Sequence, residues 1–169
     1  MNGIDVLNDA LSRIGDGARS VVEGLTGEQL NARIDGRSNS ITWLVWHAAR
    51  VQDAQVAAAF EVEQVWFTNG WAERFGLPLD AADTGYGHSS DEVARVRVED
   101  GALLTGYLDD ALAQSARVLG GVKDADLDRV VDKRWDPPVT LGVRLVSVVD
   151  DDAQHLGQAA FLRGLLEAR

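Results

Sequence analysis

The chain has 169 residues, of which 46% are hydrophobic and 25% charged, so it holds enough apolar material for one folded core. Its 27 acidic and 16 basic residues give a formal net charge of −11, which argues against nucleic acid as a partner because that binding depends on clustered lysine and arginine. The sequence contains no cysteine, which excludes disulfides, thiolate metal sites and a cysteine nucleophile.

Apolar residues recur every three or four positions along four stretches of the chain, a spacing typical of amphipathic helices. This spacing predicts helices over residues 4–25, 39–64, 90–119 and 140–167. Serine, asparagine and aspartate, which commonly cap helices, stand at the start of the second and third of them. The sequence therefore predicts an all-α fold, a four-helix bundle formed by a single domain over residues 1–169.

Two long connections separate the predicted helices. The first, residues 68–90, is rich in glycine, and loops of this length often carry function. The second, residues 124–140, contains Trp135 and the paired prolines Pro137 and Pro138, which favour an extended, tethered segment. Links of this length fit a bundle with crossover connections.

Two of the three histidines lie on the apolar faces of predicted helices. His47 follows Leu44 by three residues and precedes Val51 by four, so we expect its side chain to point into the bundle. Asp151 lies one turn before His155, so that the carboxylate and the imidazole project from the same inward face. A carboxylate at a core position is costly unless it is paired or binds a metal.

Two imidazoles and one carboxylate are a normal ligand set for a divalent ion, and helical bundles build such sites from inward side chains. The spacing therefore suggests a metal site formed by His47, Asp151 and His155, with ligand atoms about 2.0 to 2.2 Å from the ion and positions left open. In the alternative interpretation, the histidines are hydrogen-bonded core residues and Asp151 belongs to a solvated acidic run, residues 150–152. His88 is expected to be a loop residue rather than a ligand.

Longer stretches of the sequence resemble a known family. TWLVWHAARVQD (residues 42–53) and RLVSVVDDDAQHLGQAAFLRG (residues 144–164) resemble the two signature helices of the DinB-like four-helix proteins. WFTNGWAERFGLP (residues 66–78), GYGH (residues 85–88) and RWDPPVTLGVRL (residues 134–145) resemble the actinobacterial branch described as mycothiol-dependent S-transferases. The resemblance covers most of the chain and implies the same bundle fold.

The resemblance also implies a metal site. In that superfamily a histidine on the second helix and an H-x-x-x-H pair on the fourth hold the metal, and these places correspond to His47, Asp151 and His155. Asp151 departs from the common histidine, although related mycothiol-dependent isomerases are similar in using a carboxylate there. The implied metal is a divalent ion, zinc first and nickel, manganese or iron as alternatives. It would lower the pKa of mycothiol or a similar thiol, whose thiolate then attacks an electrophile.

Several polar residues near this site have two interpretations. Arg50 and Asp53 can orient a sugar-like cosubstrate or form a surface ion pair, and we favour the surface pair. Gln158, one turn beyond His155, can hydrogen-bond an imidazole or a ligand, or pack in the core. The five tryptophans can line the mouth of a pocket, but we expect them to be core or interface anchors.

The leading functional hypothesis is a metal-dependent thiol S-transferase, and the alternative is a non-catalytic bundle whose metal is structural or absent. An isomerase that uses the same thiol is a third possibility, less favoured because that family usually carries an additional C-terminal domain. Catalytic residues and the electrophile remain unknown from the sequence. We expect a cytoplasmic protein whose partners are a small thiol and an electrophile, without nucleic acid or membrane, and which can form a homodimer.

Overall fold

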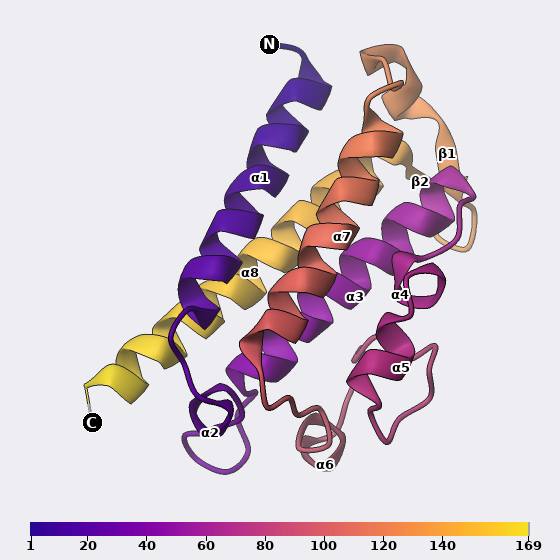
Figure 1. Ribbon diagram of the computed structural model, residues 1–169. Helices are drawn as coiled ribbons and strands as arrows, with labels where there is room; N and C mark the ends of the chain where they lie inside the picture. Colours follow the sequence, from indigo (N-terminus) through magenta and orange to yellow (C-terminus); the bar gives the residue numbers. More distant parts are fainter. Residues whose placement is uncertain (169) are drawn as a thin grey trace.

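Four long helices lie side by side in the computed structural model, which describes residues 1–168 (Figure 1). These helices are α1 (Gly3–Val22), α3 (Ile41–Phe60), α7 (Gly101–Leu119) and α8 (Leu141–Glu167). Helices α1 and α3 each pack against both α7 and α8, so the chain folds as the expected all-α four-helix bundle. Within residues 1–168, no helix combines the length and the apolar character that crossing a membrane requires.

Helix α3 is the most deeply buried element. Every residue from 41 to 50 is buried, because α7, α8 and the connection that follows α3 cover it on all sides. The side-chain hydroxyl of Ser40 accepts a hydrogen bond from the amide of Trp43 and so caps the helix at its N-terminus. At its other end, Glu61 adopts a left-handed conformation (φ 54°), so that α3 ends at Phe60 rather than near residue 64.

The prediction of one helix over residues 90–119 is wrong for its first part. A short helix, α6 (Ser90–Val93), is followed by non-helical residues 94–100, and α7 begins only at Gly101. The side chain of Asn31 donates to the carbonyl of Val98 and accepts from its amide. The backbone groups of Val98 therefore bond to a residue outside the helix and do not form helical hydrogen bonds. Asp100 then caps α7.

The connections between the long helices carry short elements of their own. Helix α2 (Gly27–Leu30) lies between α1 and α3, and α4 (Val65–Thr68) and α5 (Trp71–Phe75) follow α3. The connection before α8 holds a 3₁₀ turn, η1 (Asp124–Asp128), and an antiparallel pair of strands, β1 (Val130–Asp132) and β2 (Val139–Thr140). This hairpin is the extended segment that the paired prolines favoured, and it leads directly into α8.

Candidate metal centre

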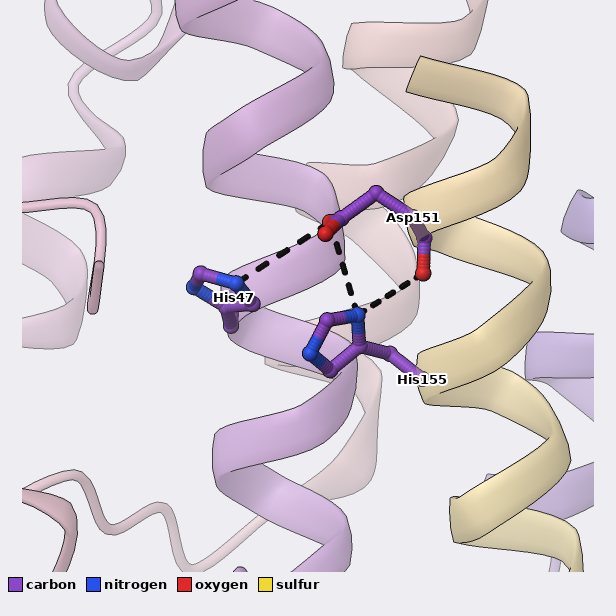
Figure 2. Close-up of side chains that lie close together, drawn as sticks. All are labelled: His47, Asp151 and His155. Carbon is purple, nitrogen blue, oxygen red and sulfur yellow. Dashed lines mark hydrogen bonds and ion pairs between the residues drawn. The ribbon is translucent and has the colours of Figure 1, made fainter. Parts of the chain in front are cut away.

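His47 on α3 faces Asp151 and His155 on α8 across the contact between the two helices (Figure 2). Each residue offers one possible ligand atom, and the three atoms lie within 4.8 Å of one another. Oδ2 of Asp151 lies 3.9 Å from Nε2 of His47 and 3.4 Å from Nδ1 of His155. The structure thus brings together the three residues that the sequence singled out.

Main-chain carbonyls orient both imidazoles. Nδ1 of His47 lies 2.5 Å from the carbonyl oxygen of Thr84, and Nδ1 of His155 lies 2.7 Å from the carbonyl oxygen of Asp151. A carbonyl can only accept, so each Nδ1 carries the proton and donates it. Nε2 of each neutral ring therefore keeps its lone pair, which is the arrangement that metal-binding histidines usually show.

The loop after α5 fixes Trp43, which in turn stacks on the ring of His47. Trp43 stacks on the His47 ring at a centroid distance of 4.5 Å and an interplanar angle of 11°. Nε1 of Trp43 donates to Nδ1 of His88, whose Nε2 donates to Oδ2 of Asp83 at 2.9 Å. His88 is therefore a buried loop anchor that uses both ring nitrogens, and it does not belong to the three-residue cluster.

Gly85 packs directly against this arrangement. A Cβ atom at this position would lie 2.8 Å from Nδ1 of His47 and 2.9 Å from the Trp46 ring, closer than real contacts allow. Its φ of 88° is also in the region that favours glycine. The first glycine of the Gly-Tyr-Gly-His sequence is therefore needed for the loop to reach His47.

The three side chains fit a divalent metal. Oδ2 of Asp151 is buried and has no hydrogen-bond donor among residues 1–168, so this carboxylate oxygen lacks a partner that a cation can supply. Two atoms that bind one zinc ion are at most about 4.4 Å apart. The 3.9 Å between Oδ2 of Asp151 and Nε2 of His47 lies within this limit, and the 4.8 Å that bounds all three possible ligand atoms slightly exceeds it, so a small movement of the side chains would bring them onto one ion. Burial lowers the pKa of His47, which favours its neutral form, whereas the nearby carboxylate of Asp151 raises the pKa of His155.

The prediction of a solvated acidic run is wrong for one of its members. Asp150 is exposed and Asp151 is half-buried, but Asp152 is fully buried. In the part of the chain that the structure describes, neither carboxylate oxygen of Asp152 has a hydrogen-bond partner. Successive helical residues are turned by about 100°, which places Asp152 on the core-facing stripe with Val148 and Leu156. Burial raises the pKa of Asp152 well above its ordinary value.

The expected surface pair of Arg50 and Asp53 is also wrong, because both side chains are buried. Arg50 donates to the hydroxyl of Tyr107 at 3.1 Å, to the side chain of Gln64 and to the carbonyl of Asp83. Asp53 accepts from the first two amides of α4 and from the Tyr107 hydroxyl. The two residues therefore tie α3 to α4, to α7 and to the loop that carries Thr84.

The remaining sequence candidates lie away from the cluster or in the core. Gln158 is exposed and is not packed in the core. Four of the five tryptophans are buried, as expected, whereas Trp135 in the hairpin loop is 63% exposed. The side chains that sequence reasoning missed are those that line a cavity of about 210 Å³ beside His47 and Asp151. They are Val51, Gln55, Thr84, Tyr86, Arg144, Ser147 and Val148.

Comparisons with known proteins agree on the fold and name a family. The family model described as mycothiol-S-transferase matches residues 6–168. A crystal structure of a conserved protein from Enterococcus faecalis is 33% identical in sequence and superimposes with a TM-score of 0.92, covering 100% of this chain and 99% of that one. No curated protein matches the chain.

Proposed function

We propose, from the premise that this chain belongs to the mycothiol-S-transferase family, that it joins the sulfur of mycothiol, or of a similar low-molecular-weight thiol, to an electrophile. We propose further that His47, Asp151 and His155 hold a divalent metal on which this activity depends. One observation carries the metal site: two oriented imidazoles and a carboxylate oxygen without a partner converge beside a cavity.

The chemistry divides between the metal and the chain. A divalent ion, when bound, would lower the pKa of a thiol placed beside it. The carbonyls of Thr84 and Asp151 hold the two imidazoles in the tautomer that leaves Nε2 free. In the transfer itself the thiol loses its proton to solvent, and its sulfur forms a bond to the electrophilic carbon. The displaced group leaves with the electron pair of the broken bond.

The side chains of the cavity favour this reaction. Val51 and Val148 contribute apolar wall, which shields the reacting sulfur from water and strengthens electrostatic interactions nearby. The negative charge of Asp151 partly offsets the charge of a bound ion, so the thiol would be less acidic than beside three neutral histidines. The nitrogen and oxygen ligands suit zinc first, with nickel, manganese and iron as alternatives.

A conjugation assay tests this proposal. The protein is stripped with a chelator, reloaded with Zn²⁺ or left without metal, and mixed with mycothiol and a generic electrophile. We expect thioether formation that requires both the protein and the metal. A protein that binds Zn²⁺ and gains thermal stability but shows no turnover with several thiols and electrophiles would instead be a non-catalytic bundle with a structural metal.

We also propose a cellular location and an oligomeric state. We expect the protein to act in the cytoplasm, where a reduced thiol is available, and to form a homodimer. Helix α8 supports the dimer because it exposes Val143, Val146 and Phe161. Analytical ultracentrifugation at micromolar concentration would show a single monomeric species if this expectation is wrong.

A further inference from the structure

A second hollow continues the cavity at the metal centre toward the β-hairpin. Its volume is about 260 Å³, and it shares Gln55 and Arg144 with the first cavity. Its other lining residues are Ala58, Ala59, Val131, Asp132 and Arg134. The two hollows together reach the size of an ordinary small-molecule site. We call the second hollow the hairpin groove.

The polar side chains of the hairpin groove are fixed by one another. Arg144 donates to Oδ2 of Asp132 at 2.9 Å and to the side-chain oxygen of Gln55. Arg134 donates to both oxygens of the same carboxylate, at 3.0 and 2.8 Å. Asp132 and Gln55 hold the side chain of Arg144, which is only 15% exposed. A ligand would therefore meet an arginine that is already ordered.

The charge of the groove selects among ligand classes. Two guanidinium groups share one carboxylate, so donors are abundant, and the amide of Gln55 and the carboxylate of Asp132 add acceptors. Hydroxyl groups both donate and accept, so a hydroxyl-rich ligand can satisfy all of these groups. An apolar ligand would leave the guanidinium N–H groups without partners, and an anion would compete with Asp132 for the arginines.

The position of the groove matches the shape of the proposed cosubstrate. Gln55 follows His47 by eight residues on α3, and Arg144 precedes Asp151 by seven residues on α8. At about 1.5 Å of rise per residue, the groove lies about 10 to 12 Å along the helices from the metal ligands. In mycothiol a single cysteinyl unit joins the sulfur to an amino sugar linked to a cyclitol, so both rings would extend in this direction.

We propose that the hairpin groove binds the sugar and cyclitol part of the thiol cosubstrate, and that Arg144, Asp132 and Arg134 thereby select a hydroxyl-rich thiol over a simple one. This inference rests on the proposed function. It assigns a binding role to the β-hairpin, which lies outside the four long helices and places Asp132 and Arg134 beside α8.

A binding experiment tests the groove without using activity or metal. Glucosaminyl-inositol, the part of mycothiol that carries no thiol, is titrated calorimetrically into chelator-treated protein. The variants are Arg144→Met and Asp132→Asn. The matched control is Arg163→Met, an arginine on the same helix that is 25% exposed and bonds to carbonyls at the end of α1. Thermal melting confirms that each variant is folded, and Asp132→Asn preserves the shape of the side chain if Arg144→Met is unstable.

We expect the wild type and Arg163→Met to bind the fragment equally and both groove variants to bind at least about tenfold more weakly, the loss expected for a hydrogen bond to a charged group. In turnover, the ratio of kcat/KM for mycothiol to that for N-acetylcysteine should fall by a similar factor in Arg144→Met and stay unchanged in Arg163→Met.

Two results would overturn the groove assignment while leaving the transferase proposal intact. One is turnover of mycothiol with unchanged specificity and fragment affinity in both groove variants. The other is inorganic phosphate that displaces the fragment in an Arg144-dependent manner, which would make the groove an anion site. If no thiol is turned over, the transferase proposal fails, but fragment binding by the wild type that is lost in the groove variants still supports the groove.

Discussion

Replacing Asp151 with alanine tests the proposed metal centre most directly. The substitution removes one of the three proposed ligands and leaves two imidazoles that are still oriented by main-chain carbonyls, which no side-chain change at residue 151 removes. Loss of a residue that merely orients a ligand costs about 10- to 100-fold in metal affinity, so loss of the ligand itself should cost at least about 100-fold. Asp151→His should retain or improve binding, because it restores the commoner H-x-x-x-H pair.

The effect is measurable as stability. Zn²⁺ at about 100 times its dissociation constant stabilises a folded protein by about 2.7 kcal/mol, which in a domain of this size raises Tm by about 5 to 10 °C. We expect this rise in the wild type and its absence in Asp151→Ala at the same zinc concentration. Asp150→Ala is the matched control, because it removes an equal charge from the adjacent, exposed position on α8.

The zinc content of the wild type and of both variants, measured after identical loading and desalting, can refute this prediction. Equal content in the wild type and in Asp151→Ala would remove Asp151 from the site and leave two histidines, too few for the proposed chemistry. An equal loss in Asp150→Ala would also contradict the reasoning, since it would mean that the general negative charge of α8 attracts the ion and that no specific ligand is involved.

Three further predictions concern the residues that support the site. Gly85→Ala should lower zinc affinity and reduce Tm, because the added methyl group would lie 2.8 Å from Nδ1 of His47; calorimetric titration with zinc and thermal melting measure both effects. Arg50→Met should lower the free energy of unfolding by about 3 to 5 kcal/mol in urea titrations, because it leaves Asp53 buried without its cation, whereas the exposed control Arg13→Met should change it little. Asp132→Asn should flatten the dependence of Tm on pH in acid. The hydrogen bonds from Arg134 lower the pKa of Asp132 in the folded state, so its stabilisation is complete above the unfolded pKa of about 4 and is lost as pH falls below it. A wild-type Tm that stays constant from pH 5 to pH 3 would contradict this last expectation.

The sequence by itself determined the long helices and the cluster on two of them. Apolar residues at three- and four-residue spacing locate α1, α3 and α8 to within a few residues, because helical periodicity is a local property. The same periodicity places Asp151 and His155 on one face, one turn apart. That His47 faces them follows from the bundle, in which the apolar faces of α3 and α8 must pack against each other.

Only the tertiary structure decided which polar residues are buried and where the third long helix begins. Arg50 and Asp53 are inside because a connection up to 33 residues away in sequence folds over α3. Asn31 bonds to Val98, 67 residues away, and so ends the helical run before residue 101. The hairpin groove likewise exists because Asp132 and Arg144 meet across a turn of the chain. A side chain's solvent exposure and hydrogen-bond partners are set by residues that are distant in sequence, and no local pattern of hydrophobicity records them.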